Sequence, residues 1–382
     1  MDDHTPHIEW MLTQGRFQTM QGLVDGLGAR LRAGGIPVMR MRLGIRTTHP
    51  LTAAFSVMWE ADGNRIAPNL AQHGLETRSA YIGSPMAHIS ETRTPFRRKL
   101  TGPLNETDHL FLHEMQDRGA TDYYGLPLEF SMGTGGILTL VSDGPDGFSA
   151  DQITTIDQIA SVLAPVVEPY ERHHLATSIA TSYLGARTGQ RVLDGQITRG
   201  DIETIEAAIL ISDIRGWTRI NATRPPSEAL ELANRYFEVI SDAVDRNEGE
   251  ILKFLGDGVL ALFPSDGTAA GRDRACRNAM TAAQAAHDIA AQSGLDAAFG
   301  IGIHFGEVLY GNIGARARID FTVLGQAVNI AARIEALTAT LGHAVLVSDT
   351  VAGTMVGQMT HVGTEPLKGL EAPMPVYSPA KS

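Results

Sequence analysis

The chain has 382 residues, of which 43% are hydrophobic and 19% are charged, and its formal net charge is −12 at pH 7. This length is too great for one ordinary core and predicts two domains, while the composition excludes a disordered chain. The acidic balance argues against general binding of nucleic acid, which depends on a basic surface.

The hydrophobic pattern and the cysteine content further limit the class of protein that the chain can belong to. No apolar run approaches the ~18 residues of a membrane-spanning helix, and the N-terminus MDDHTPHIEW is too polar and acidic for a secretory signal. Cys276 is the only cysteine, which excludes an internal disulfide and is compatible with a reducing cytoplasm. We therefore expect a cytoplasmic protein with no membrane span, in which Cys276 is a small buried residue on a helix.

The first predicted elements are a helix and two strands. Residues 8–31 carry apolar side chains at helical spacing, which Gly34-Gly35 ends. In VMRMRLGIR (38–46) the apolar residues Met39, Met41, Leu43 and Ile45 alternate with arginines, which predicts a strand with one apolar face and arginines on the other. AAFSVMWE (53–60) predicts a second strand, which ends at the turn 62–64.

Residues 65–120 carry no clear secondary-structure pattern, but they include two histidines four residues apart. His109 and His113 at this spacing could bind metal or haem. No third ligand is apparent, and a solvated helix face also explains the pair.

Strands are predicted at 124–131 and 136–142, joined by GTGG, and a long helix follows from Ser149, which could cap it. Pro165 and Pro169 are expected to kink or break that helix. The strand pair, the helix start FSAD and the departing helix resemble the closing part of a GAF sensory domain, over residues 124–175. The resemblance implies an α/β GAF-like regulatory domain at 1–172, which receives an unknown small-molecule or protein signal. A dimerisation scaffold is the alternative.

Residues 173–204 are predicted to be a helical linker and transducer element, in which Gly185, Gly189 and Gly195 break short helices. Beyond it the order is regular, and the predicted elements are strand 206–212, helix 227–246, strands 250–255 and 258–263, helix 269–292 and strand 297–305. This βαββαβ order predicts an α+β, ferredoxin-like domain at 205–382 with helices on one face of an antiparallel sheet. Ser227 is the expected N-cap of its first helix, and 247–249 the stop.

Two carboxylates lie where strands of this domain end. Asp213 closes the strand AILIS, and Asp257 lies between two glycines after ILKFL. Asp257-Gly258 alone would indicate only a hairpin turn. Adjacent strands of this topology bring both acids to the same sheet edge, where two carboxylates and substrate oxygens suit Mg²⁺.

Other polar residues nearby suit a nucleotide. Gly216 would let backbone N–H groups approach phosphate. Lys253 could meet a base acceptor such as an adenine nitrogen, and Thr322 a second base position. Asn329 and Arg333 share one stripe of the helix QAVNIAARIEAL, where they could hold phosphate and ribose oxygens, although a solvated helix face has the same pattern.

Four segments, SDIRGWT, ILKFLGDGVLALF, FGIGIHFGEVLYGNIG and FTVLGQAVNIAARIE, together resemble the class III nucleotide cyclases, in particular adenylate cyclases. The resemblance implies that Asp213 and Asp257, with Ile214, bind two Mg²⁺ (or Mn²⁺) per active site. It implies that Lys253 and Thr322 select adenine and that Asn329 and Arg333 stabilise the transition state. Gly216, Trp217, Thr218 and Lys368 would bind substrate.

This chain departs from the family pattern at two positions. Thr322 stands where many members carry aspartate, although a subgroup has threonine, and Trp217 replaces the usual phenylalanine. Since guanylate cyclases typically have glutamate in place of the lysine, Lys253 favours ATP.

The resemblance implies conversion of ATP to cyclic AMP and pyrophosphate in a head-to-tail homodimer, because the family's active site forms between two cyclase domains. A guanylate cyclase and a catalytically silent nucleotide-binding module are the alternatives. A diguanylate cyclase does not fit, since the chain lacks a GGDEF-type signature.

Overall fold

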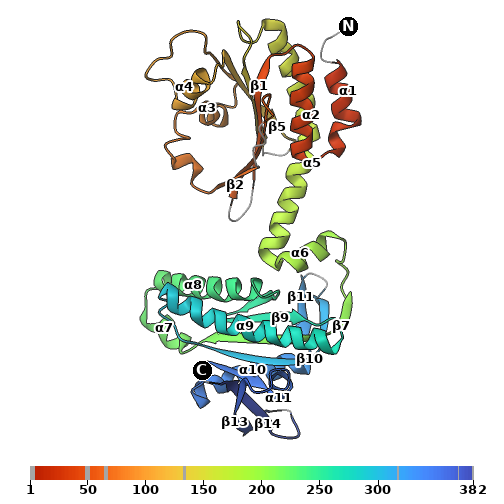
Figure 1. Ribbon diagram of the computed structural model, residues 1–382, viewed down its shortest axis with the longest axis vertical. Coiled ribbons are helices and arrows are strands. Elements are labelled where there is room, and N and C mark those ends of the chain that lie inside the picture. Colours follow the sequence, from red (N-terminus) through yellow and green to blue (C-terminus); the bar gives the residue numbers. More distant parts are fainter. Residues whose placement is uncertain are drawn as a thin grey trace. The chain divides into compact units, whose positions relative to one another are not determined.

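The computed structural model describes residues 5–47, 52–63, 68–131, 135–315, 318–368 and 370–380. The chain forms two compact units, residues 1–179 and 180–382 (Figure 1).

Within the described part of the N-terminal unit, the strands form one antiparallel sheet in the order β3-β2-β1-β6-β5-β4. These strands are β1 (Val38–Arg46), β2 (Thr52–Glu60), β3 (Asn69–Gln72), β4 (Phe96–Lys99), β5 (Asp122–Glu129) and β6 (Gly135–Ser142).

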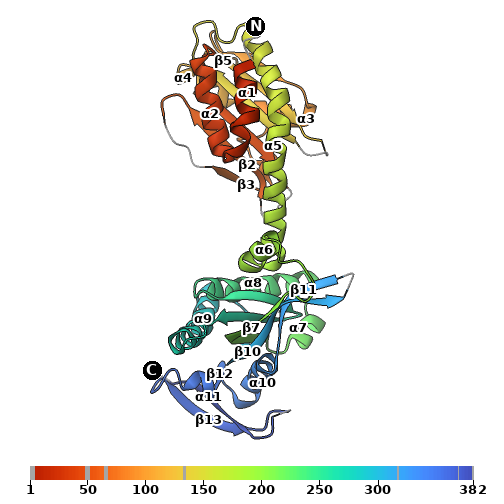
Figure 2. The same cartoon turned by 90° about the vertical axis from the view of Figure 1, so that its right-hand side faces the viewer.

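Helices cover both faces of this sheet (Figures 1 and 2). The helices α1 (Thr5–Thr13), α2 (Met20–Ala33) and α5 (Ala150–Leu184) pack on one face and form the main core with it. On the other face lie α3 (Pro85–Thr92) and α4 (Leu110–Asp117), and α4 contributes to a smaller cluster around Tyr123. Single 3₁₀ turns lie at Gly15–Phe17 and Leu75–Thr77.

The predicted helix at 8–31 is wrong as one element, because the chain forms α1, a 3₁₀ turn and then α2, which Thr19 caps. The side chains of Trp10 and Leu23 crowd the position where a side chain at Gly15 would lie, so the chain turns tightly there. The predicted stop is confirmed, since α2 ends at Ala33 before Gly34.

The cap of α5 is confirmed, and of the predicted kink or break at its prolines the break does not occur. Ser149 Oγ accepts from Gln152 N at 3.2 Å while Gln152 Oε1 accepts from Ser149 N at 2.9 Å, which is a capping box. The helix continues through Pro165 and Pro169 to Leu184. Each proline removes one hydrogen bond, but residues on both sides of Pro165 are buried against the sheet, and this packing outweighs the loss.

The alternation in β1 is confirmed for most of the strand. Met41, Leu43 and Ile45 are buried in the main core. Met39 is the exception, because an irregularity in the pairing between Val38 and Arg40 turns its side chain to the cluster that contains α4.

The structure gives His109 and His113 local roles in place of a metal site. His109 caps α4 by accepting from Phe111 N at 3.2 Å, and His113 Nε2 lies 3.2 Å from the Asn105 carbonyl oxygen. No group of three or more His, Cys, Asp or Glu suited to a metal occurs among the residues that the structure describes.

The C-terminal unit contains an eight-stranded sheet within its described residues, in the order β13-β14-β12-β10-β7-β9-β8, with β11 paired to β10. Its strands are β7 (Ile202–Ile214), β8 (Glu250–Leu255), β9 (Gly258–Pro264), β10 (Phe299–Ala315), β11 (Arg318–Leu324), β12 (Val345–Ser348), β13 (Met359–Glu365) and β14 (Met374–Pro379). Its helices beyond α5 are α6 (Ala186–Leu193), α7 (Trp217–Thr223), α8 (Pro226–Asp245), α9 (Ala269–Ser293), α10 (Gln326–Leu341) and α11 (Asp349–Ala352).

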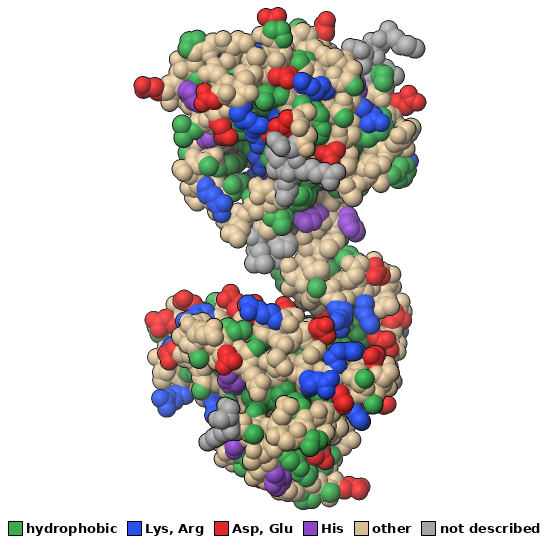
Figure 3. All heavy atoms as spheres, in the orientation of Figure 1, with side chains coloured by type: hydrophobic (Ala, Val, Ile, Leu, Met, Phe, Trp, Pro, Cys, Tyr) green, Lys and Arg blue, Asp and Glu red, His purple; other side chains and the backbone are tan. Residues whose placement is uncertain are grey.

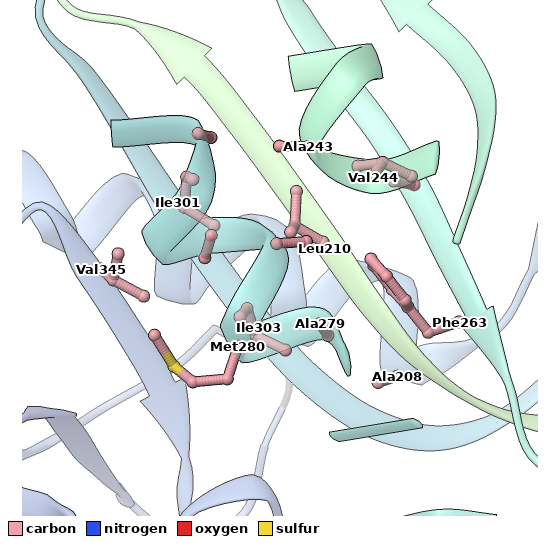
Figure 4. Packing of buried hydrophobic residues seen from close by; sticks show 14 of the residues in the cluster. Ala208, Leu210, Ala243, Val244, Phe263, Ala279, Met280, Ile301, Ile303 and Val345 are labelled. Atoms are coloured by element: carbon pink, nitrogen blue, oxygen red, sulfur yellow. The ribbon is translucent and has the colours of Figure 1, made fainter. Parts of the chain in front are cut away.

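The predicted βαββαβ order is present from β7 to β10. The helices α8 and α9 pack on one face of this sheet (Figure 4), as predicted, but α10 packs on the other face and β12 runs parallel to β10. The expectation of helices on one face of a purely antiparallel sheet is therefore wrong for the whole domain. Cys276 is buried on α9, as expected.

Two local expectations in this unit are wrong. The helix α8 starts at Pro226 with Pro225 as its N-cap, so Ser227 lies inside the first turn. A proline is favoured at the first helical position because its backbone torsion φ is already helical. Gly189 does not break a helix but lies within α6. Its role is to let α6 approach α5 closely, because a side chain at this position would clash with the backbone of Ala180.

No described helix is both long and apolar enough to cross a membrane. On the face shown in Figure 3, acidic and basic side chains lie interspersed on both units.

Candidate active site

The pairing of β7 with β9 brings Asp213 and Asp257 together. In the antiparallel register Asp213 lies opposite Gly258, and Asp213 Oδ1 is 3.3 Å from the position that a β-carbon on Gly258 would take. Asp257 precedes that glycine, so the two carboxyl groups are neighbours, and Asp257 contributes to the raised pKa of Asp213.

The turn that carries Asp257 differs from the predicted pair Asp257-Gly258. The strands β8 and β9 are joined by Gly256 and Asp257, because Leu255 already pairs with Gly258. Gly256 has φ +67. A positive φ at the first of two loop residues is typical of a type II′ hairpin turn.

A third carboxylate, on Glu335 of α10, interacts electrostatically with this pair. Burial, with the neighbouring Asp257, raises the pKa of Asp213 to about 6. Burial, with the charge of Asp213, raises the pKa of Glu335 to about 7, and the nearby Arg215 opposes this shift. The cluster therefore disfavours its own negative charge, and either a proton or a cation stabilises it.

The acids fit a divalent cation. Asp213, whose pKa is raised by burial and by the neighbouring Asp257, gives up its proton more readily when a cation binds beside it, because the cation stabilises the charged form. No group of three or more side chains in the described ranges is arranged so that it could hold a metal ion by itself, so substrate oxygens would complete the shell, as Mg²⁺ prefers. The Ile214 carbonyl follows Asp213 in the chain, and Ile214 N donates to Asp213 Oδ1 at 3.1 Å.

The loop after β7 leads directly into α7. Gly216 has φ +69 and precedes Trp217, whose side chain packs partly buried against the core of the unit. The first two N–H groups of a helix, here those of Trp217 and Thr218, have no acceptor within the helix and are available to an anion, whereas Arg219 N already donates to the Gly216 carbonyl oxygen at 3.0 Å.

A β-bulge orients Lys253. The register of β8 with β9 shifts between Ile251 and Lys253, so that Leu252 is the extra residue. Lys253 forms an ion pair with Asp320 of β11. Thr322 is two residues further along β11 and is buried, so it lies on the same face of that strand as Asp320. The structure therefore pairs Lys253 with Asp320, which lies two residues before Thr322 on the same face of β11.

Asn329 and Arg333 lie on α10, as predicted, with Ile330 and Ile334 buried beneath them. Gly302 of β10 lets this helix approach the sheet, because a β-carbon there would be 2.3 Å from Glu335 N. Glu335 faces the paired acids. At 100° per residue Arg333 lies about 200° away around the helix.

The two halves of the predicted site are therefore not joined within one chain. Asn329 lies about 240° from Glu335 on the same geometry, so it shares the side of Arg333 and not that of the acids. Asn329 is exposed and Arg333 partly buried. Lys368 is exposed in the connection between β13 and β14, and no described contact links it to the acids.

Sequence reasoning missed three charged residues of this region, namely Asp320, Glu335 and Arg215. Asp320 could have been found from its position two residues before Thr322, because residues two apart in a strand point to the same face. Glu335 was visible as an acid on the side of α10 opposite Arg333. Arg215 Nη2 donates to the His343 carbonyl oxygen at 2.6 Å, a contact between distant segments that has no local signal.

A buried glutamate ties α6 to this region. Thr188 N and Oγ1 donate to Glu250 Oε1 at 2.9 and 2.6 Å, and Tyr310 Oη donates to Glu250 Oε2 at 3.0 Å. Glu250 is 5% exposed and begins β8, the strand that carries Lys253. The segment before β7 is thus anchored to β8 three residues before Lys253.

Residues 202–378 match the family model described as the adenylate and guanylate cyclase catalytic domain. This part of the chain is a class III nucleotide cyclase catalytic domain. The family description covers both nucleotides, so the match leaves open which nucleotide this domain uses.

Several individual relatives each match less than half of the chain. An adenylate cyclase of Anabaena cylindrica is 36% identical over 160 residues, 40% of this chain and 31% of that protein. The chain thus spans about a third of that curated relative. The adenylyl cyclase CyaB of P. aeruginosa is 25% identical, with a TM-score of 0.42 over 47% of this chain and 96% of that one. A guanylate cyclase domain from Catenaria anguillulae in complex with GTP is 18% identical, with a TM-score of 0.39 over 47% of this chain and all of that one (100%).

The raised pKa of Asp213 predicts a pH-dependent stability in the absence of divalent ions. Because the folded cyclase domain holds this proton more tightly than the unfolded chain, its free energy of unfolding falls as the pH rises from about 4 to about 6. Asp213→Asn removes the free-energy cost of ionising this carboxylate in the folded domain and should stabilise the protein at pH 7.5 by about 1–2 kcal/mol. Urea unfolding in EDTA across this pH range measures the effect.

Asp266→Asn is the matched control, because hydrogen bonds from Thr268 and Arg274 lower the pKa of Asp266 to about 2. This substitution should destabilise the protein at pH 7.5, with the opposite sign. Equal loss of stability in both variants would contradict the predicted repulsion at Asp213.

Proposed function

We propose that this protein is an adenylate cyclase, which converts ATP to 3′,5′-cyclic AMP and pyrophosphate. The observation that carries the proposal is the pairing of β7 with β9, which brings the acids Asp213 and Asp257 to one sheet edge. The acids of one subunit supply a cation site for a triphosphate, and Lys253 with its neighbours, on the other subunit, supplies a recognition surface for the base.

The preference for ATP rests on Lys253, Asp320 and Thr322. Lys253 can donate to adenine N1, and the Asp320 carboxylate and the Thr322 hydroxyl can accept from the adenine amino group. Guanine presents an oxygen where adenine has the amino group, and this oxygen would face the carboxylate unfavourably. Asp320 thereby supplies the acidic acceptor that many family members carry at the position of Thr322.

We further propose a symmetric head-to-tail homodimer with two equivalent sites. One chain contains both halves of a site, but Asn329 and Arg333 lie on the side of α10 away from the acids of the same chain. A second copy related by a two-fold axis would place its Asn329 and Arg333 against these acids, and the reverse contact would complete the other site.

In this reaction the ribose 3′-oxygen attacks the α-phosphorus, the bond from that phosphorus to the bridging oxygen of pyrophosphate breaks, and the 3′-hydroxyl proton passes to solvent water. Two Mg²⁺, when bound by Asp213, Asp257 and the Ile214 carbonyl, would favour the alkoxide and neutralise the triphosphate. Arg333 of the partner subunit stabilises the charge that builds on the α-phosphoryl oxygens, and Asn329 of the partner subunit orients the ribose. The N–H groups from Gly216 to Thr218 bind phosphate oxygens, and Lys368 is proposed as an additional phosphate contact.

Two alternatives make different predictions. A guanylate cyclase would produce cyclic GMP from GTP, and a silent module would bind a nucleotide without releasing pyrophosphate. The silent module is disfavoured because the acids, the Asn329/Arg333 pair and Lys253 are all present in this chain.

We propose that residues 1–172 are a GAF-like regulatory domain and that α6 transmits its state to the cyclase domain. The antiparallel sheet with long helices on one face and short helices on the other supports the first part. The bonds from Thr188 and Tyr310 to Glu250 support the second, because a shift of α6 would move the start of β8.

The shared site predicts complementation between inactive variants. With ATP and Mg²⁺ the full chain should release cyclic AMP, identified by chromatography, and Asp257→Ala and Arg333→Ala should each lower kcat by about a hundredfold or more. Mixing the two variants should restore about a quarter of the wild-type rate, since half of the randomly mixed dimers keep one intact site.

The control is a mixture of Asp213→Ala with Asp257→Ala, in which every site lacks an acid and no activity should return. If native mass spectrometry shows exchanged subunits but the first mixture stays inactive, the head-to-tail site is wrong. Cyclic GMP as the main product would instead identify the guanylate alternative.

Asp320 should set the choice of base. Asp320→Asn removes a charged acceptor for the adenine amino group, so the ratio of kcat/KM for ATP to that for GTP should fall about tenfold. Asp242→Asn is the matched control, because it makes the same charge change in a surface ion pair with Arg246 on α8. An unchanged nucleotide ratio in Asp320→Asn would contradict the role of Asp320.

The link through Glu250 predicts a local change on β8. Thr188→Val removes a hydroxyl donor to a buried carboxylate at nearly constant volume, so stability should fall by about 1–3 kcal/mol and the amides of β8 should exchange hydrogen faster. In Thr223→Val the lost hydroxyl bonds only to carbonyls of its own exposed helix, and β8 should not change. Identical β8 exchange in the two variants would refute the mechanical link.

A further inference from the structure

The N-terminal unit contains a cavity of about 310 Å³ on the sheet face opposite α1, α2 and α5. The strand β1 lines it with Arg40, Arg42 and Arg46, while its apolar residues such as Leu43 face the core. Neighbouring residues of a strand point to opposite faces. The arginine face predicted from the sequence therefore lines a cavity.

The lining of this cavity is strongly basic in a chain whose net charge is −12. Arginines stand at positions 40, 42, 46, 78 and 93, whereas Glu76 is the single carboxylate among the described lining residues. Glu76 pairs with Arg46 at 2.8 Å. Arg40 lies 3.5 Å from Glu60, which Arg118 also binds. The protein's own acids thus balance only part of the charge.

Arg42 has no carboxylate partner within the described residues. It donates to Met86 Sδ at 3.2 Å and to Ser56 Oγ at 3.1 Å, and its Nε atom is buried without a hydrogen-bond partner. A thioether is a weak acceptor. Burial, with the positive charge of Arg40, lowers the pKa of Arg42. Burial of an unpaired guanidinium costs desolvation free energy, and a bound anion would offset this cost.

The surroundings of Arg42 combine hydroxyl groups with apolar walls. The side chains of Ser56, Tyr123 and Thr139 line the cavity and are buried, and Phe111 and Met86 add apolar surface. A small-molecule site typically has this composition, with an apolar lining and a few placed polar groups.

We propose that this cavity binds a small organic carboxylate. Its carboxyl group would accept hydrogen bonds from Arg42, with Ser56 as a further donor, and its apolar body would pack against Phe111 and Met86. A guanidinium matches a carboxylate through two parallel hydrogen bonds, and one unpaired arginine balances one such charge. This binding is independent of the proposed cyclase activity, because it requires neither nucleotide nor divalent ion.

The test is calorimetric titration and thermal unfolding of the full chain, without nucleotide or divalent ions, against acetate, hexanoate and benzoate. At least one carboxylate should bind with one site per chain and raise the unfolding temperature. Its uncharged amide of the same shape should bind about tenfold to a hundredfold more weakly, because the charge-assisted hydrogen bonds are lost.

Arg42→Met should weaken carboxylate binding to the same extent, and Arg42→Lys, which keeps the charge without the planar fork, should recover part of it. Arg32→Met is the matched control, since Arg32 pairs with Asp143 and does not line the cavity. If Arg42→Met fails to fold by circular dichroism, Arg42→Lys and the amide comparison still decide.

Three results would overturn the proposal. The wild-type chain could bind none of the three carboxylates, or the Arg42 variants that fold could bind them as tightly as the wild type. Tighter binding of phenyl phosphate than of benzoate, lost in Arg42→Met, would assign the site to phosphate groups and reject the carboxylate.

Discussion

The antiparallel pairing of β7 with β9 determines the geometry on which the candidate active site depends. Its register sets Asp213 opposite Gly258, so an acid at the end of one strand meets the acid in the turn before the next. Two partly buried carboxylates at this distance repel each other when both are ionised, and the raised pKa of Asp213 follows from burial and from this neighbour. Binding of a cation at this edge of the sheet would therefore reduce the repulsion between the two ionised carboxylates.

The helix α10 divides the functional groups of the cyclase domain between two sides. Gly302 lets the helix approach the sheet closely, which sets Glu335 toward the acids. The spacing of 3.6 residues per turn then turns Asn329 and Arg333 away. The proposed dependence on a second copy is therefore a consequence of helix geometry, because no rotation of α10 could bring both sets of side chains to one place.

In each of the two units, side chains of like charge lie close together, and the protein's own side chains of opposite charge neutralise them only in part. In the cyclase domain these are carboxylates at a strand end, and in the N-terminal unit they are arginines along β1. Each arrangement costs folding free energy unless a ligand of opposite charge is bound. A cation and a triphosphate are the proposed ligands of the first, and a carboxylate of the second.

Local sequence determined which segments are strands and helices in the cyclase domain, and it identified Asp213, Asp257, Lys253 and Arg333 as candidates. It could not show that β8 carries a bulge or that Asp320 pairs with Lys253, because these contacts join segments that are distant in the chain. In the N-terminal unit, periodicity identified the arginine face of β1, but only the packing of α3 and α4 over it made that face a cavity wall. Side-chain period is a local property, whereas burial and charge pairing depend on what the whole chain places opposite each face.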